Sequence, residues 1–260
     1  MADALDREIA RQLRMAERMA APIAPFAHRI GPADIDRAYR IQHLNTRHAI
    51  EAGRQHCGWK IGLTAEAVQR QLGVDEPDYG ALHADMALRS GDSLDLSNLI
   101  HPRIEAEIGL VVSSDITRRG LSPETVAGSI AHAVPALEIV DSRIADWKIG
   151  IVDTIADNGA AARFVLGDRT HPLGTVDLAR CRMELRRNGV PVSAGVGAAS
   201  LGHPLTALCW LADILIDHGM VLRTGDLVLT GALGPVAPLA SGDRFTAAFD
   251  QLSDVTLHVR

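Results

Sequence analysis

Three glutamates in two apolar segments of the chain carry its strongest chemical signal. Glu105 and Glu107 lie in the segment 102–112, and Glu138 stands alone in the apolar run 134–140. A β-strand places residues i and i+2 on one face, so Glu105 and Glu107 are expected to point the same way. Glutamate is seldom buried without a partner, and Mg²⁺ and Mn²⁺ prefer oxygen ligands. The pattern predicts a carboxylate-only site for one of these ions.

A simpler interpretation of the pair stays open at this point. Glu105 and Glu107 could form the wet face of an antiparallel strand, with Ile104, Ala106 and Ile108 turned toward the core. Glu138 weakens that interpretation, because the residues around it offer no polar face.

Lys60 is a second candidate, because it lies between Trp59 and Ile61 in a short apolar strand over 57–63. Its stem could pack while its head reaches water. Alternatively, a desolvated ammonium could bind a carboxylate or move protons, and desolvation would lower its pKa.

Three further segments are candidates for the functional site, and two of them could instead be simple turns. Asp78 lies in the segment 77–80, which predicts a turn, and the segment 157–159 could likewise be only a turn. The segment 230–235 is rich in small residues, as is typical where backbone approaches a ligand closely.

The elements that must position these residues change in character along the chain. Apolar spacing and cap residues predict helices early on, and from about residue 81 short strands alternate with glycine turns. The fold class is therefore α+β, with a small helical N-terminal part before a larger β-rich part. The expected helices are 3–20, 32–52, 65–72 and 204–219, and the expected hairpin pairs 182–187 with 190–193.

Composition narrows the class of protein. A formal net charge of −6 without a long basic run argues against a nucleic-acid partner. We expect no membrane span, on the interpretation that no apolar stretch approaches the ~18 residues that a span needs. The N-terminus has acidic residues and helical spacing, unlike a signal peptide. Cys57, Cys181 and Cys209 form no metal-binding pair, which fits free buried thiols in the cytoplasm.

Seven segments together resemble the 2-keto-4-pentenoate hydratase group of the fumarylacetoacetase superfamily. The resemblance covers nearly the whole chain from about residue 30, and the set is collectively specific. The segments are Gly58-Trp-Lys-Ile-Gly-Leu-Thr64, Pro77-Asp-Tyr-Gly80, Pro102-Arg-Ile-Glu-Ala-Glu-Ile108, the run 136–147, Ile151-Val-Asp-Thr-Ile-Ala-Asp-Asn158, Leu201-Gly-His-Pro204 and Thr230-Gly-Ala-Leu-Gly-Pro235.

This resemblance implies an N-terminal α+β part, 1–80, followed by a fumarylacetoacetase-like mixed β-roll, 81–260. It implies a homo-oligomer, for which the amphipathic N-terminal helix offers a surface to bury. It also implies roles for eleven residues: Glu105, Glu107 and Glu138 hold Mg²⁺ or Mn²⁺, Lys60 and Asp78 act in catalysis, and Ile61, Gly62, Leu63, Thr230, Gly231 and Ala160 contact the substrate.

The implied reaction adds water to a 2-hydroxy-2,4-dienoate in the meta-cleavage catabolism of aromatic or steroid rings, and it yields a 4-hydroxy-2-oxoacid. A glutamate as third ligand and the segment 230–235 both resemble hydratases. One departure is the run Gly159-Ala160-Ala161, where the group usually carries a serine. The alternatives are a 2-oxo-3-hexenedioate decarboxylase, an acylpyruvate C–C hydrolase and a non-catalytic partner subunit.

Overall fold

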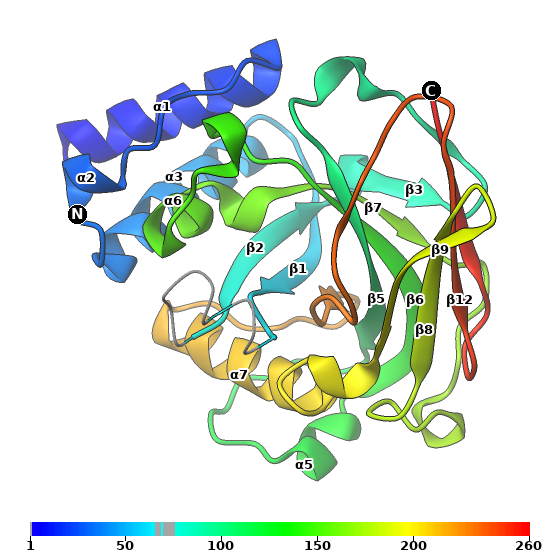
Figure 1. Ribbon diagram of the computed structural model, residues 1–260. Coiled ribbons are helices and arrows are strands. Elements are labelled where there is room, and N and C mark those ends of the chain that lie inside the picture. Colours follow the sequence, from blue (N-terminus) through cyan, green and yellow to red (C-terminus); the bar gives the residue numbers. More distant parts are fainter. Residues whose placement is uncertain (1, 66–68, 70–75) are drawn as a thin grey trace.

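A computed structural model describes residues 2–65, 69 and 76–260 of the chain, and it has two β-sheets packed face to face with helices around them. The larger sheet runs in the order β2-β1-β10-β5-β6-β7-β3, with β11 paired to β5. It lies at the centre of Figure 1. Its strands are β1 (His56–Gly62), β2 (Asp78–His83), β3 (Ala87–Arg89), β5 (Arg103–Val112), β6 (Ile130–Val140), β7 (Ala161–Leu166), β10 (Leu227–Leu229) and β11 (Ala237–Pro238).

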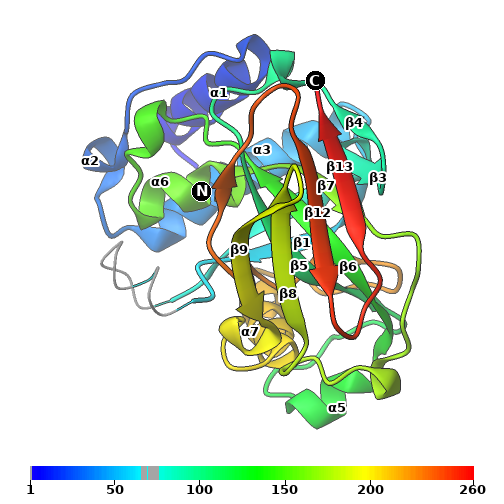
Figure 2. The ribbon, with the colours of Figure 1, turned by 45° about the vertical axis from the view of Figure 1, so that its right-hand side comes forward.

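The smaller sheet covers one side of the larger one, as Figure 2 shows in front of β5 and β6. Its order is β4-β13-β12-β8-β9. The predicted hairpin is confirmed, because β8 and β9 pair antiparallel and Asn188 and Gly189 both take the positive φ that its turn requires. Its strands are β4 (Ser93–Leu94), β8 (Arg182–Arg187), β9 (Val190–Val196), β12 (Arg244–Phe249) and β13 (Val255–Val259).

Four helices, α1, α2, α3 and α6, lie together beside the β1–β2 end of the larger sheet. There α1 packs on α3, and α3 packs on α6. The helix expected over 32–52 begins three residues later, because the Asp34 side chain accepts a hydrogen bond from the Arg37 amide and caps it. The helix expected over 65–72 falls mostly outside the described residues. The described helices are α1 (Ala4–Met19), α2 (Ala27–Ile30), α3 (Ile35–Glu51), α5 (Pro123–Ala127), α6 (Ile151–Ala156) and α7 (Pro204–Asp217).

Two premises drawn from apolar sequence patterns are wrong, whereas the expectations that they supported, no membrane span and a homo-oligomer, stay predictions. The stretch Gly197–Asp217 is long and apolar enough, by length and composition alone, to cross a membrane. In this fold it includes α7, whose Leu208 and Leu211 are buried in the main core. The apolar face of α1, with Ile9 and Leu13, is likewise buried within the chain, so it is not free to form an interface between copies.

The larger sheet contains strands from both sides of the predicted boundary at residue 80, since β1 pairs with β2 and with β10. The division of the chain into parts 1–80 and 81–260 stays a prediction. All three cysteines are free as expected; Cys181 is buried, whereas Cys57 and Cys209 are only partly so.

Candidate metal centre and active site

The three glutamates meet at one point of the larger sheet. Glu105 lies directly opposite Glu138 in the antiparallel β5–β6 pair, and Glu107 lies opposite Ala136. Because the register is fixed and side chains alternate, all three carboxylates leave the same face of the sheet. They are buried, and one oxygen from each lies within 4.8 Å of the others. The wet-face interpretation of Glu105 and Glu107 is therefore wrong, because this face is inside the protein.

Burial and mutual repulsion shape the electrostatics of this cluster. Burial, and then the charge of Glu138, raise the pKa of the Glu105 carboxyl to about 8. The same two causes hold the pKa of Glu107 well above its usual range. Without a cation, the Glu105 and Glu107 carboxyls therefore hold a proton more readily than ordinary glutamates do.

The donor set fits a hard divalent cation. Among the described residues, no hydrogen bond reaches Glu107 Oε1 or either carboxylate oxygen of Glu138, although these atoms are buried. The second oxygen of Glu107 accepts a hydrogen bond of 2.8 Å from the Gly231 amide, which fixes how that carboxylate is turned. Three oxygen-only ligands with free lone pairs suit Mg²⁺, Mn²⁺ or Ca²⁺ better than softer metals.

Lys60 reaches this cluster from β1. Its ammonium lies 3.4 Å from Glu138 Oε1, and its side chain is almost fully buried. Burial alone would lower the pKa of the ammonium, but the charges of Glu138 and Asp78 outweigh it and hold that pKa above its usual value. The expected lowering is therefore wrong, because the sequence did not show how many carboxylates surround the lysine. Lys60 does not reach water.

Asp78 lies beside Lys60, and the turn expected over 77–80 is wrong. Asp78 begins β2, where Gly80 pairs with Lys60 and Asp78 pairs with Gly62. A Cβ built on Gly62 would lie 2.1 Å from Asp78 Oδ1 and 3.2 Å from Lys60 Nζ, so the two charged groups are neighbours across this glycine. Burial raises the pKa of the Asp78 carboxyl, and Lys60 opposes that rise.

The residues predicted to bind substrate differ in what they offer. The Gly231 amide bonds to Glu107, and Gly62 lies between Lys60 and Asp78. Leu63 has a positive φ where the chain leaves β1, and Ala160 has a positive φ before β7. Ile61 is buried in the main core.

Thr230 has its hydroxyl already engaged, because Oγ1 donates to the Ile108 carbonyl at 2.8 Å. Its side chain therefore ties β5 to the chain that follows β10. Ile61 alternates with Lys60 along β1, so its side chain points to the opposite face. Any contact of Ile61 with substrate would come from its backbone.

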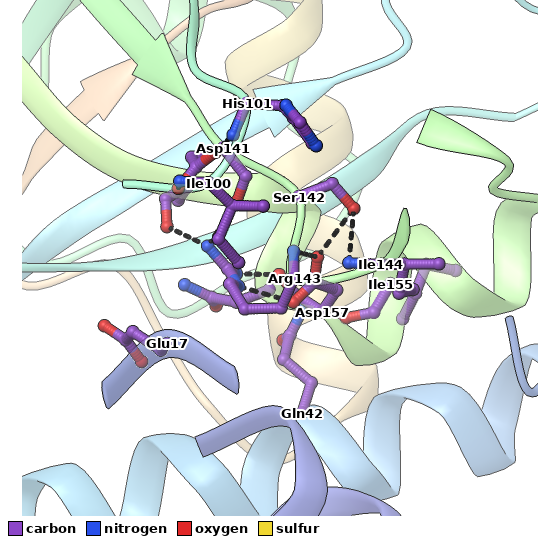
Figure 3. Close-up of polar contacts among 12 residues, drawn as sticks. Glu17, Gln42, Ile100, His101, Asp141, Ser142, Arg143, Ile144, Ile155 and Asp157 are labelled. Carbon is purple, nitrogen blue, oxygen red and sulfur yellow. Dashed lines mark hydrogen bonds and ion pairs between the residues drawn. The ribbon is translucent and has the colours of Figure 1, made fainter. Parts of the chain in front are cut away.

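Sequence reasoning missed a buried polar network beside the site, drawn in Figure 3. Arg143 Nε donates to Asp157 Oδ1 at 2.6 Å, and its other nitrogens donate to the carbonyls of Asp141, Asp157 and Ala161. Ser142 also donates to Asp157. The available signal was the charged pair of Asp141 and Arg143 directly after the apolar strand β6.

Known proteins resemble this chain along nearly its full length. The family model "Fumarylacetoacetate (FAA) hydrolase C-terminal" matches residues 41–260. The chain is 47% identical over 234 residues to 2-keto-4-pentenoate hydratase 1 of Dechloromonas aromatica, covering 90% of this chain and 89% of the relative. It is 36% identical to 2-hydroxyhexa-2,4-dienoate hydratase of Comamonas testosteroni, covering 95% and 94% of the two chains.

A solved structure also has the same fold as this chain. The 4-oxalocrotonate decarboxylase from Pseudomonas putida G7, complexed with magnesium and adipate, superposes with a TM-score of 0.96 at 31% identity. The superposition covers 100% of this chain and 99% of that one. With its fold and sequence matched over this length, the chain belongs to the fumarylacetoacetate hydrolase family, within the group of its 2-keto-4-pentenoate hydratases.

Proposed function

We propose that this protein is a hydro-lyase that adds water to a 2-hydroxy-2,4-dienoate of the 2-oxo-4-pentenoate type and releases a 4-hydroxy-2-oxoacid, as in the meta-cleavage breakdown of aromatic or steroid rings. One observation carries the proposal. A buried cluster of three carboxylates next to a buried lysine occurs in a chain that is 43–47% identical to seven proteins named as hydratases.

The proposed cofactor is a divalent cation held by Glu105, Glu107 and Glu138. Mg²⁺ or Mn²⁺ is the expected ion, and solved relatives carry magnesium, calcium or Mn²⁺. When bound, such an ion would supply positive charge that binds the 2-oxoacid end of the substrate and stabilises negative charge at its 2-oxygen.

Lys60 and Asp78 are the proposed proton carriers. The dienol must first become a 2-oxo-3-enoate, which needs the 2-hydroxyl proton removed and one proton delivered at C5. Water addition then needs one proton removed from the attacking water at C4 and one proton delivered at C3. An ammonium can donate a proton and a carboxylate can accept one, so this buried pair has both functions side by side. Gly62 lies between the two groups, where a Cβ would clash with Asp78 Oδ1, so glycine lets them lie this close.

The other predicted substrate contacts remain part of this proposal. Gly231, Thr230, Leu63, Ile61 and Ala160 would line the site mainly with backbone and small side chains. Their packing supports this role, since Gly231 lies directly against Thr64 and leaves no space for a side chain of its own.

Decarboxylation is the second candidate, because a decarboxylase at 31% identity shares the whole fold. The higher identity to hydratases favours hydration, and so does the hydratase-like segment 230–235. A C–C hydrolase is less well supported, since the structure named as a fumarylpyruvate hydrolase from Pseudomonas aeruginosa is only 17% identical.

We also propose that the protein works as a homo-oligomer in the cytoplasm, with no nucleic-acid or membrane partner. The free cysteines fit a reducing compartment. Light scattering at assay concentration should give a mass well above the 27.8 kDa of one chain, and a value equal to one chain would refute the oligomer.

The reaction class is tested by product analysis. Purified protein with Mg²⁺ should convert 2-hydroxypenta-2,4-dienoate to a 4-hydroxy-2-oxoacid without releasing CO₂. Faster release of CO₂ from a 2-oxo-3-hexenedioate, judged by kcat/KM, would establish the decarboxylase instead. No turnover of either compound would favour a non-catalytic partner subunit.

A further inference from the structure

Lys60 lies in a slot whose walls are glycines. A Cβ built on Gly80 would lie 3.3 Å from Lys60 Cγ, and one built on Gly159 would lie 3.2 Å from Lys60 Cδ. With Gly62 beside the ammonium, backbone flanks the whole side chain. Because these walls are backbone and not flexible side chains, their position limits where the stem of Lys60 can lie and so how far its ammonium reaches.

One wall of the slot is a turn of unusual conformation. Asn158, Gly159 and Ala160 have φ values of 58°, 59° and 57°, so three successive residues are left-handed. Glycine adopts this region freely, whereas Asn158 and Ala160 do so at a steric cost. Such a turn persists only where its surroundings hold it.

Asn158 holds this turn against β2. Its side-chain Oδ1 accepts from the Ala81 amide at 2.8 Å, and its Nδ2 donates to the Ala81 carbonyl at 2.9 Å. Since β2 is an edge strand of the larger sheet, the Asn158 amide pairs with it as another strand would. Gly80, which pairs with Lys60, has the Asn158 carbonyl against it.

A cleft of about 370 Å³ lies beside the turn, lined in part by Asn158, Ala161 and Arg143. Gly159 and Ala160 are buried, and the Ala160 carbonyl accepts a hydrogen bond of 2.8 Å from the Asp141 amide after β6. Arg143 holds Asp157, the residue before the turn, through a hydrogen bond to its carboxylate, as Figure 3 shows. The two hydrogen bonds of Asn158 are thus the direct link between the turn and the strand beside Lys60.

We propose that Asn158 is a positioning residue for Lys60: its amide fastens the left-handed turn to β2 and so fixes how far the Lys60 ammonium reaches toward the carboxylate cluster. This inference rests on the role of Lys60 in the proposed function. It gives the segment 157–159 a purpose beyond a simple turn.

The variant Asn158→Gly tests this role, because glycine keeps the left-handed backbone and removes only the amide. Misplacing a catalytic group by about 1 Å can cost about 100-fold in rate. We expect kcat to fall by roughly 10- to 100-fold, with KM and Mg²⁺ affinity changed by less than about twofold. If this variant does not fold, Asn158→Asp, which keeps the acceptor and loses the donor, carries the same test.

Asn188→Gly is a matched control. Asn188 also has a positive φ, of 53°, and its side chain also makes two hydrogen bonds, to Asp243 and to the Arg244 amide. It lies in the β8–β9 turn on the smaller sheet. We expect wild-type kcat from this variant.

A double-mutant cycle separates positioning from a general structural role. If Asn158 acts through Lys60, Asn158→Gly should cost less than about twofold in a Lys60→Met background. An equal loss in both backgrounds, or wild-type kcat for Asn158→Gly alone, would overturn the positioning role. If Lys60→Met itself kept wild-type activity, the role of Lys60 in the proposed function would fail, and this inference with it.

Discussion

Glu105 and Glu138 face each other directly across the β5–β6 ladder, both buried, with the Lys60 ammonium 3.4 Å from one of them. Like charges opposite each other on neighbouring strands destabilise a sheet. One ammonium does not balance three carboxylates and Asp78. The folded protein therefore holds carboxylates that repel one another, and a bound divalent cation would reduce that repulsion. We expect the free energy of unfolding to depend on pH and on metal for this reason.

The first prediction concerns the protein in EDTA. The pKa of Glu105 is raised from 4.5 to about 8, first by burial and then by Glu138. A group with a raised pKa favours the folded state most below its unfolded pKa, and this contribution is lost as pH rises. Stability should therefore fall between about pH 4.5 and 8, by at most about 1.4 kcal/mol per pH unit for this group.

Urea unfolding across that pH range measures the effect. Glu105→Gln should flatten the slope, because glutamine takes up no proton. Added Mg²⁺ should stabilise the wild type most at high pH, where ion binding displaces the fewest protons. A metal-free protein whose stability does not change from pH 5 to 8 would contradict this account.

The second prediction concerns the third ligand. Glu138→Gln removes one negative charge and leaves a similar shape, so Mg²⁺ affinity should fall on the order of 10- to 100-fold, since charge count sets such affinities. Titration calorimetry measures it. Glu184→Gln, at a partly exposed position on β8, is the control and should bind as wild type does. Normal binding by Glu138→Gln would mean that the site is misassigned.

The third prediction uses the fact that the chain has only two lysines, Lys60 and Lys148. Lys60→Met should lower kcat by about 10²- to 10⁴-fold, the usual loss of a proton carrier, while Mg²⁺ still binds. Lys148 is exposed and pairs with Asp146, so Lys148→Met should keep full activity. A rate within a few-fold of wild type for Lys60→Met would leave Asp78 as the leading proton carrier.

The fourth prediction concerns the Arg143–Asp157 pair. Arg143→Met leaves the buried Asp157 carboxylate without its guanidinium, which should cost about 3–5 kcal/mol of unfolding free energy. The double variant Arg143→Met/Asp157→Asn should recover part of this loss, because no charge is then left buried. Equal stability of the single and double variants would show that the unpaired Asp157 charge is not the cause of the loss.

The residues that the structure brings together at the candidate site could be found from sequence, because each is a charged residue in an apolar segment. Glu105 and Glu107 have strand spacing, and Glu138 and Lys60 interrupt apolar runs, so their burial needed a chemical explanation. The general α+β order and the β8–β9 hairpin followed from periodicity and from Asn188-Gly189. These are local signals, and local signals suffice for elements and candidate residues.

What depended on long-range pairing could not be predicted. Proline and glycine around Asp78 are turn-like, yet pairing with β1 makes this segment an edge strand. The pKa shift of Lys60 was predicted in the wrong direction, because that direction depends on carboxylates contributed by β2, β5 and β6. The role of Asn158 was hidden, because Ala81, its partner, is 77 residues away in sequence.

The most direct test of the central claim is the fate of solvent oxygen. Wild-type protein, stripped of metal and then supplied with Mg²⁺, is incubated with 2-hydroxypenta-2,4-dienoate in H₂¹⁸O, and the product is analysed by mass spectrometry. The account predicts a 4-hydroxy-2-oxoacid with one ¹⁸O in its C4 hydroxyl, formed only when Mg²⁺ is present. A product without label at C4, or equal turnover in EDTA, would contradict it.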